Sequence, residues 1–180
     1  MKYKIILADP PWSYENENTG GNMCSGSKAK YPTMSLEEIK SVDIASISDK
    51  NCVLFLWTTT PLAQEGFEVM KAWGFKYKTT IYWRKIMSLG MWFWFRGQVE
   101  TLLVGIKGKV KAFRSQRPNF IQSKAGRHSQ KPYEMYGLIE EIAKKHDLYP
   151  MIELFARHKR EGWSALGNQV PKEEQRLLRC

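Results

Sequence analysis

The sequence predicts a single α/β domain with a largely parallel sheet. Short apolar segments alternate along the chain with segments of helical apolar spacing, which is the pattern of parallel strands joined by helices. A chain of 180 residues has about the size of one ordinary domain, with little room for a second. Hydrophobic residues make up 43% and aromatic residues 13% of the chain, so a mainly disordered protein is excluded.

The first predicted strand, residues 4–8, ends on the turn Asp9-Pro10-Pro11-Trp12. The two prolines can neither donate to a sheet ladder nor continue a helix. Residues 13–31 are rich in Asn, Gly and Ser and are expected to form a mobile loop. A long loop beside a strand end is often functional.

The next elements are predicted from capping signals and apolar runs. Ser35 is followed three residues later by Glu38, which is a capping box, so a short helix should begin near Leu36. Residues 53–57 form an apolar run that suits a buried strand.

A second helix is predicted with Thr60 as its cap, Pro61 at its first position and Gly74 at its end. A third helix should begin at Pro132 and end near His146, after a basic last turn. The remaining predicted strands are residues 79–83, 101–106 and 149–155.

The most specific feature is the turn itself, because proline makes up only about 5% of residues in general. Its prolines fix the backbone so that a carboxylate and a main-chain carbonyl point to one spot beside a flat indole. That set suits an exocyclic amine, whose N–H groups would donate to the Asp9 carboxylate and the Pro10 carbonyl while the base stacks on Trp12. The alternative is a rigid strand-end turn with a packed Trp12.

Several motifs follow in a fixed order from about residue 5 to residue 170. Together with the turn, they resemble the MT-A70 family of S-adenosylmethionine-dependent adenine N6-methyltransferases, in particular its small microbial and phage members. The motifs are Tyr31-Pro32-Thr33-Met34-Ser35, Leu54-Phe55-Leu56-Trp57, the segment 100–108, His128-Ser129-Gln130-Lys131-Pro132, Glu153-Leu154-Phe155-Ala156-Arg157, Gly162-Trp163 and Leu166-Gly167-Asn168-Gln169.

The resemblance implies a single-domain, Rossmann-like methyltransferase fold over residues 1–170, followed by a polar tail at 171–180. The motif order would be permuted, with the catalytic motif before the cofactor motif. Asp9 and Pro10 would hold the target amine in the turn that Pro11 completes, and Trp12 would stack on the adenine. The methyl group would pass directly from the sulfonium to N6, so catalysis would consist of positioning and exposure of the nitrogen lone pair.

The resemblance also implies a set of residues that bind S-adenosylmethionine. Lys131 matches a lysine that faces the methionine carboxylate, a role that a lysine at a helix start can fill. Phe155 would pack near the cofactor, with core packing as its alternative, and Glu153 would orient Arg157 or a ribose hydroxyl, with a supporting ion pair as its alternative. The full set is Asp9, Lys131, Phe155, Arg157, Asn168 and Gln169, of which the last three would hold the ribose and adenine.

The chain is strongly basic, with 28 Lys and Arg against 18 Asp and Glu and a net charge of +10. This balance favours nucleic acid as a partner, with an acidic membrane surface as the rival. No apolar run approaches the roughly 20 residues that span a bilayer, and no signal peptide is apparent, so a cytoplasmic protein is expected. The cysteines Cys24, Cys52 and Cys180 are too far apart to indicate a disulfide framework or a metal site.

Much of the positive charge lies between residues 107 and 131, where the sequence has no Asp or Glu. We predict a loop here that grips phosphates beside the active site, with a solvated basic face as the alternative. Residues 88–97 contain a run of aromatics before Arg96, which suits core or oligomer packing or base stacking. The predicted nucleic-acid contacts are Arg96, Lys107, Lys109, Lys111, Arg114, Arg117, Lys124 and Arg127.

The leading hypothesis is a site-specific DNA adenine N6-methyltransferase, because the compact chain shows no appended RNA-binding module. RNA adenine is the alternative substrate, and a non-catalytic nucleic-acid-binding subunit is the alternative role, although the intact Asp9 and Lys131 oppose it. An amino-group methyltransferase for small molecules or proteins is disfavoured by the basic loop. A homodimer and a family-related partner subunit are both compatible with the sequence.

Overall fold

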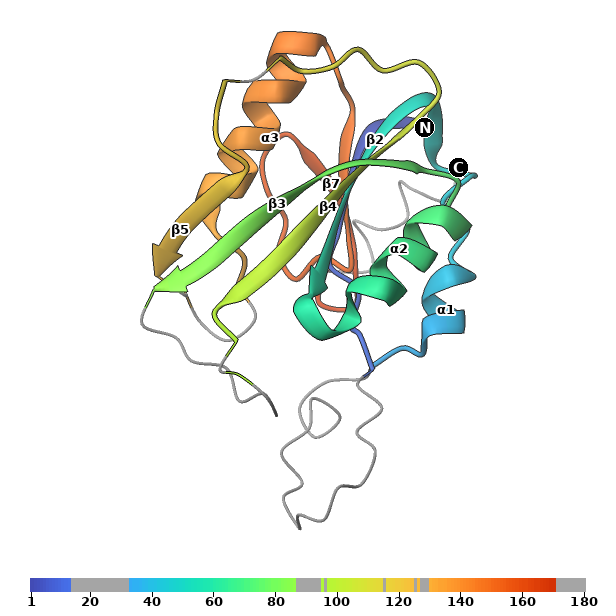
Figure 1. The fold of residues 1–180 in the computed structure, drawn as a ribbon. Helices are drawn as coiled ribbons and strands as arrows, with labels where there is room; N and C mark the ends of the chain where they lie inside the picture. Colours follow the sequence, from blue (N-terminus) through green and yellow to red (C-terminus); the bar gives the residue numbers. More distant parts are fainter. Residues whose placement is uncertain are drawn as a thin grey trace.

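The computed structural model describes residues 1–13, 33–86, 95, 97–114, 116–124, 126 and 130–170. These residues form one seven-stranded sheet in the order β5-β3-β4-β2-β1-β6-β7 (Figure 1). The strands are β1 (Tyr3–Ala8), β2 (Ser48–Thr59), β3 (Lys76–Ile86), β4 (Val99–Lys107), β5 (Phe120–Lys124), β6 (Met151–Leu154) and β7 (Trp163–Leu166). The helices are α1 (Leu36–Lys40), the 3₁₀ turn η2 (Thr60–Leu62), α2 (Ala63–Ala72) and α3 (Tyr133–His146).

All strands except β4 run in one direction. β1 is parallel to β2 and β6, β6 is parallel to β7, and β3 is parallel to β5, whereas β4 is antiparallel to both β2 and β3. The predicted α/β class with a largely parallel sheet is therefore confirmed. The carboxyl ends of the parallel strands and the start of β4 meet at one edge, which is where ligands bind in such sheets.

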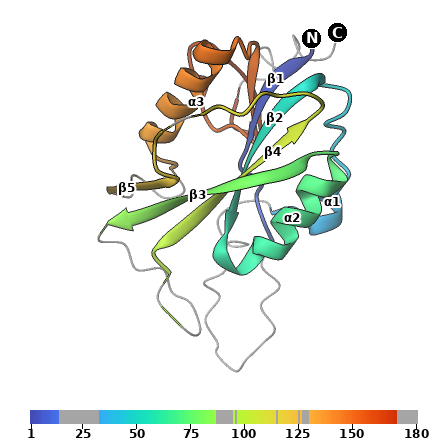
Figure 2. The same ribbon diagram turned by 45° about the horizontal axis from the view of Figure 1, so that its top comes forward.

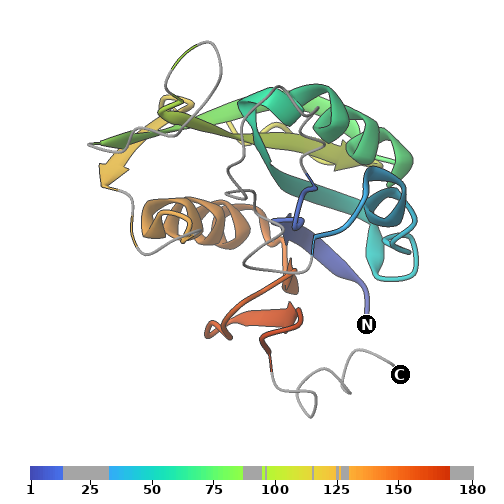
Figure 3. The ribbon, with the colours of Figure 1, turned by 90° about the horizontal axis from the view of Figure 1, so that it is seen from below.

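Helices cover both faces of the sheet (Figure 2, Figure 3). On one face, Leu7 of β1 belongs to a buried cluster with Met135 and Ile139 of α3. On the other face, Ile6 belongs to a cluster with Val69 of α2 and with α1. Because successive strand residues point to opposite faces, the near-continuous apolar sequence of β1 supplies both clusters.

The predicted capping box is confirmed and begins α1 at Leu36. The Ser35 hydroxyl accepts a hydrogen bond from the Glu38 backbone N–H at 3.3 Å, and the Glu38 carboxylate accepts one from the Ser35 backbone N–H at 2.7 Å. This reciprocal pair satisfies donors that a helix start otherwise leaves unpaired.

The second helix begins differently from the prediction. Thr60 and Pro61 lie in the 3₁₀ turn η2, and α2 starts only at Ala63. The Thr60 hydroxyl donates to the Val99 carbonyl oxygen at 3.2 Å, so it ties this turn to the start of β4 instead of capping the helix. Gly74, with φ at 81°, follows the helix end as predicted.

Two strands were not predicted. Phe120–Lys124 was expected to be loop and forms β5, and Trp163–Leu166 forms β7. Both lie at edges of the sheet, and their residues are mostly half-buried or exposed. An edge strand covered on one face lacks the continuous apolar run that identifies a central strand.

Alanine substitutions of two glycines should change the free energy of unfolding in opposite directions. Gly108 follows β4 with φ at 68°, and a Cβ there would overlap the Lys50 carbonyl oxygen. We expect Gly108→Ala to lower the free energy of unfolding by about 2 kcal/mol or more, because it adds both strain and a clash. Gly137 is exposed within α3 and has open space around it, so Gly137→Ala should raise that free energy by about 0.5–1 kcal/mol.

Urea denaturation of both variants beside the wild type measures the two free energies. An unchanged or raised stability for Gly108→Ala would contradict the close approach of this turn to the start of β2.

Candidate active site

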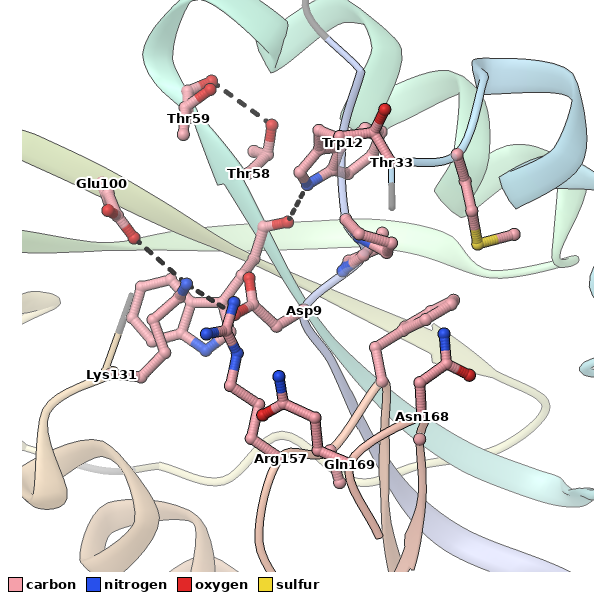
Figure 4. Close-up of a pocket in the computed structure, with 17 residues that line it drawn as sticks. Asp9, Trp12, Thr33, Thr58, Thr59, Glu100, Lys131, Arg157, Asn168 and Gln169 are labelled. Atoms are coloured by element: carbon pink, nitrogen blue, oxygen red, sulfur yellow. Dashed lines mark hydrogen bonds and ion pairs between the residues drawn. The ribbon is translucent and has the colours of Figure 1, made fainter. Parts of the chain in front are cut away.

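A pocket of about 370 Å³ lies at the edge where the parallel strands end (Figure 4). Segments distant in sequence form its walls: those that follow β1, β6 and β7, the last residues of β2, Glu100 near the start of β4, and Lys131 just before α3. Its volume is in the range of small-molecule sites. The lining residues are Asp9, Pro10, Pro11, Trp12, Thr33, Met34, Trp57, Thr58, Thr59, Glu100, Lys131, Phe155, Ala156, Arg157, Gly167, Asn168 and Gln169.

The structure brings all the predicted catalytic and cofactor residues to this one pocket. The turn residues come from the end of β1, and the predicted cofactor residues come from the start of α3 and the ends of β6 and β7. The shared location follows from the parallel topology, because the carboxyl ends of β1, β6 and β7 are neighbours in the sheet. Their individual roles remain predictions.

The turn after β1 is held by main-chain and indole hydrogen bonds. The Trp12 N–H donates to the Pro10 carbonyl at 2.9 Å, and the Met34 N–H donates to the Pro11 carbonyl at 2.8 Å. The Trp12 indole N–H donates to the Trp57 carbonyl at 3.1 Å. Trp12 is 8% exposed and belongs to the buried cluster on the α2 side, and it also lines the pocket. Both predictions for Trp12 therefore agree with its position: its side chain packs in the core and borders the pocket.

A series of alternating charges, here called the charge chain, runs from Asp9 through Lys131 and Glu100 to Lys85, and the first three of these residues line the pocket. The Lys131 Nζ lies 2.6 Å from the Asp9 carboxylate and 3.5 Å from that of Glu100, and Lys85 forms an ion pair with Glu100 on its other side. The side chains of Lys131 and Glu100 are only 11% and 16% exposed. The Lys131 ammonium also lies 5.4 Å from the centre of the Trp57 ring, within the range of a cation–π contact.

The partners in this chain keep one another charged. Burial alone would raise the pKa of Glu100, but Lys131 and Lys85 outweigh burial and hold it below its ordinary value. Burial alone would lower the pKa of Lys131, but the carboxylates of Asp9 and Glu100 outweigh burial and raise it. Both side chains are therefore ionised at neutral pH, as a closely paired cation and anion require.

Glu100 begins the motif segment 100–108, but no role was predicted for its side chain, and Lys85 was not among the predicted residues. Glu100 stands at the start of an apolar strand, and only the antiparallel direction of β4 brings it to the pocket edge, opposite Thr59 of β2. Lys85 reaches it from the neighbouring strand β3, where Trp83 is the direct partner of Glu100. The sequence signal that could have found Glu100 is an acidic residue at the start of an otherwise apolar strand.

Glu153 lies in β6 beside β1, and the Tyr136 hydroxyl donates to its carboxylate at 2.8 Å. Burial is the largest cause of its raised pKa, and the nearby Asp9 carboxylate raises it further. The Arg160 guanidinium lies 3.9 Å from the centre of the Tyr136 ring. Glu153 is not among the residues that line the pocket. The structure pairs its carboxylate with the Tyr136 hydroxyl, and its predicted roles stay predictions.

The two segments that carry Arg157 and Asn168 approach each other closely. The Ala156 N–H donates to the Leu166 carbonyl at 3.0 Å, and a Cβ on Gly167 would overlap the Ala156 carbonyl oxygen. A residue without a side chain is therefore required here. The contact keeps the guanidinium and the amides of Asn168 and Gln169 on one wall of the pocket (Figure 4).

The prediction of one basic loop beside the pocket is wrong for Lys107 and Lys109. Because β4 is antiparallel, Glu100 marks its pocket end and Lys107 its opposite end, roughly 24 Å away at about 3.4 Å per residue. There the Lys107 ammonium donates to the Ser48 hydroxyl at 2.8 Å, and the Lys109 N–H donates to the Asn51 side chain at 2.7 Å.

The other predicted nucleic-acid contacts are spread over the molecule. Lys111 and Arg114 are exposed in the segment after Lys109, and Arg117 forms an ion pair with Glu141 of α3 at 2.6 Å. Lys124 ends β5 at the same edge as the pocket. Outside the described residues lie Arg96 and Arg127, all of the predicted loop 13–31 except Ser13, most of the aromatic segment 88–97, and residues 171–180.

Two further observations concern the described ranges only. In that part of the chain, no helix combines the length and apolar character needed to cross a membrane. There too, no group of three or more His, Cys, Asp or Glu side chains is arranged to hold a metal ion.

Comparison with known proteins identifies the family. The family model described as MT-A70 matches residues 3–169. The chain belongs to the MT-A70 family. The Rossmann-like methyltransferase fold with its permuted motif order is thereby confirmed, and methyltransferases of this family use S-adenosylmethionine as the methyl donor.

Individual MT-A70 relatives cover the chain almost completely. A protein of Mycoplasma sp named Type II methyltransferase M.MunI is 36% identical over 94% of this chain and 78% of its own length. A putative N(6)-adenosine-methyltransferase MT-A70-like of Medicago truncatula is 32% identical, and the human N(6)-adenosine-methyltransferase catalytic subunit METTL3 is 29% identical. The matches cover 94% of this chain but only 26% and 28% of those two proteins.

The pocket residues fit S-adenosylmethionine chemically. The cations Lys131 and Arg157 suit its carboxylate and ribose, the amides of Asn168 and Gln169 suit hydroxyl and ring nitrogen groups, and Phe155 and Trp57 supply apolar walls.

The charge chain can be tested through stability. Glu100→Gln removes the carboxylate between two ammonium groups, so we expect the free energy of unfolding at pH 7 to fall by roughly 1–3 kcal/mol. Because folding lowers the pKa of Glu100, its contribution is present above the ordinary value of 4.5 and is lost as the pH falls through the folded-state value. The difference from wild type should therefore shrink as the pH falls from 7 to 3.

Urea denaturation across this pH range measures the difference. Glu141→Gln is the matched control, since the ion pair of Glu141 with Arg117 is largely exposed and should contribute at most about 1 kcal/mol. Equal losses for the two variants, or a difference that does not change with pH, would contradict the charge chain.

Proposed function

We propose that the protein transfers a methyl group from S-adenosylmethionine to N6 of adenine in DNA. The observation that carries the proposal is the convergence on one pocket of the Asp9 turn with the polar groups that follow β6 and β7. A target amine and a methyl donor held by these two sets would meet at the carboxyl end of β1.

The turn provides two acceptors and a ring for an adenine. The Asp9 carboxylate and the Pro10 carbonyl would accept the two N–H groups of the exocyclic amine, which localises the lone pair on N6. The Pro10 carbonyl also accepts the Trp12 N–H at 2.9 Å, so its direction is fixed before a substrate arrives. Positioning of this kind lowers the barrier without strong base chemistry.

The opposite wall would hold the cofactor. When bound, S-adenosylmethionine supplies an electrophilic methyl group. Lys131 would face its carboxylate, Phe155 would pack beside it, and Arg157, Asn168 and Gln169 would hold its ribose and adenine. Glu100 supports this role of Lys131. Its carboxylate would still pair with the ammonium while the Asp9 carboxylate binds the amine of the substrate.

DNA is proposed over RNA on the similarity to relatives. The bacterial Type II methyltransferase is the more similar of those described above and matches over most of its own length, whereas the adenosine methyltransferases match over about a quarter of theirs. The same chemistry on RNA adenine is the alternative that these adenosine methyltransferases support.

Substrate preference is measured with methyl-labelled cofactor and matched oligonucleotides of DNA and RNA, both single- and double-stranded. We expect N6-methyladenine, identified by mass spectrometry of the nucleosides, in DNA. Methylation of RNA alone would replace the DNA proposal. Binding of oligonucleotides without methyl transfer in any arm would support a non-catalytic subunit.

Asp9→Asn tests the catalytic site. The amide keeps the size of the side chain but loses the negative charge that orients the target amine and pairs with Lys131. We expect kcat for methyl transfer to fall at least about 100-fold, measured with the same labelled cofactor. The matched control is Asp147→Asn at the exposed end of α3, which should retain activity. Unchanged activity of Asp9→Asn would refute the assigned role.

A further inference from the structure

The sheet has an exposed aromatic and basic face on β3 and β5, here called the β3–β5 face. Its residues are Tyr82, Arg84, Phe120, Gln122 and Lys124. In both strands the alternate residues point the other way: Trp83 is buried in the cluster on the α3 side, and its indole N–H donates to the Ser123 hydroxyl at 2.9 Å. Because side chains alternate along a strand, the β3–β5 face lies on the α2 side of the sheet.

The residues of this face are paired across the two strands. Tyr82 lies opposite Phe120, and the two rings are 42% and 45% exposed. Arg84 lies opposite Gln122 and donates to its side-chain oxygen at 3.3 Å. The two exposed rings and the two cations Arg84 and Lys124 therefore form one continuous surface.

Helix α2 covers only the neighbouring part of this side of the sheet. Its Phe67 packs edge-on against Tyr77, at the beginning of β3, with ring centres 5.0 Å apart. Figure 1 and Figure 3 show β5 at the end of the sheet away from α2. Large exposed rings on a sheet face are uncommon without a partner.

The charge of the two strands indicates the chemistry of that partner. Together β3 and β5 contain no Asp or Glu. Their cations are Lys76, Lys78, Arg84, Lys124 and Lys85, of which Lys85 points to the other face and pairs with Glu100. Flat rings flanked by cations suit a nucleic acid, whose bases stack on the rings while its phosphates pair with the cations. A second copy of the chain would bring like charges together, which opposes a dimer through this face.

The β3–β5 face lies close enough to the pocket for one nucleic-acid molecule to contact both. Arg84 and Lys124 lie toward the carboxyl edge that holds the pocket. β3 is separated from β1 by three strand spacings of about 4.8 Å, or roughly 15 Å. A nucleic-acid strand whose adenine enters the pocket can therefore pass over the carboxyl edge of the sheet and reach the β3–β5 face within a few nucleotides.

We propose that the β3–β5 face binds an unpaired segment of the nucleic acid next to the target adenine. Tyr82 and Phe120 stack on its bases, since only unpaired bases expose their faces to such rings. Arg84 and Lys124 contact its phosphates. The proposal rests on the proposed function, because it assigns a second contact to the same substrate.

The test compares binding and turnover of surface variants. Single-stranded oligonucleotide binding is measured by fluorescence anisotropy across a salt series for Tyr82→Ala with Phe120→Ala, and for Arg84→Gln with Lys124→Gln. We expect at least about fivefold weaker binding without the rings. Without the cations, the slope of log K against log salt should be shallower by about 0.7 per lost phosphate contact. KM for the oligonucleotide should rise more than kcat falls.

The controls are distant residues of matched chemistry. Tyr149→Ala removes a ring of the same 42% exposure outside this face, and Lys144→Gln with Lys145→Gln removes two exposed cations from the end of α3. Thermal unfolding of every variant separates lost binding from lost folding.

Two results would overturn the proposal. In one, the surface variants bind and methylate like the controls, which leaves the proposed function intact. In the other, sedimentation shows that the wild type is a dimer which the surface variants dissociate, with unchanged affinity per chain for the oligonucleotide. Failure of the wild type to methylate any nucleic acid is a separate outcome and refutes the proposed function instead.

Discussion

The ammonium group of Lys131 between the carboxylates of Asp9 and Glu100 holds the candidate site together. It joins three segments far apart in sequence: the end of β1, the start of β4 and the start of α3. A cation in so enclosed a place costs free energy unless carboxylates surround it. Here each charge has at least one close partner, so the network can stay ionised inside a pocket.

The same contact ties the proposed substrate wall to the proposed cofactor wall. Asp9 belongs to the turn that would hold an adenine, and Lys131 belongs to the set that would hold S-adenosylmethionine. The rest of the fold fixes the distance between them, since the apolar residues of β1 and α3 pack in one buried cluster beneath the pocket. Under the proposed function, positioning by the fold would be enough for methyl transfer without a covalent intermediate on the protein.

The sequence predicted the central sheet and nearly the whole candidate site, for an identifiable reason. β1 is buried on both faces and ends at an Asp-Pro-Pro-Trp turn, so both its strand character and its functional end are visible in local sequence. The edge strands β5 and β7 were missed because a strand covered on one side has a weak apolar pattern. Their positions depend on pairing with β3 and β6, which local sequence does not encode.

The contribution of Glu100 and the true position of Lys107 depend on one feature that sequence spacing does not show, the antiparallel direction of β4. With β4 parallel, Lys107 would lie at the pocket and Glu100 at the opposite edge. The observed direction reverses them, so an acid joins the pocket and the basic segment begins at the far edge. The surface that we propose for nucleic acid therefore lies on β3 and β5, whose carboxyl ends are at the same edge of the sheet as the pocket.

The most direct test of the central claim is the modified bases in nucleic acid from cells that express the protein. The nucleosides are quantified, and the sequence around each modified adenine in DNA is read, for the wild type and for Asp9→Asn. The account predicts N6-methyladenine in DNA within a recurrent sequence context for the wild type and its absence for the variant. Equal levels of N6-methyladenine in both, or none above the background of cells without the protein, would contradict it.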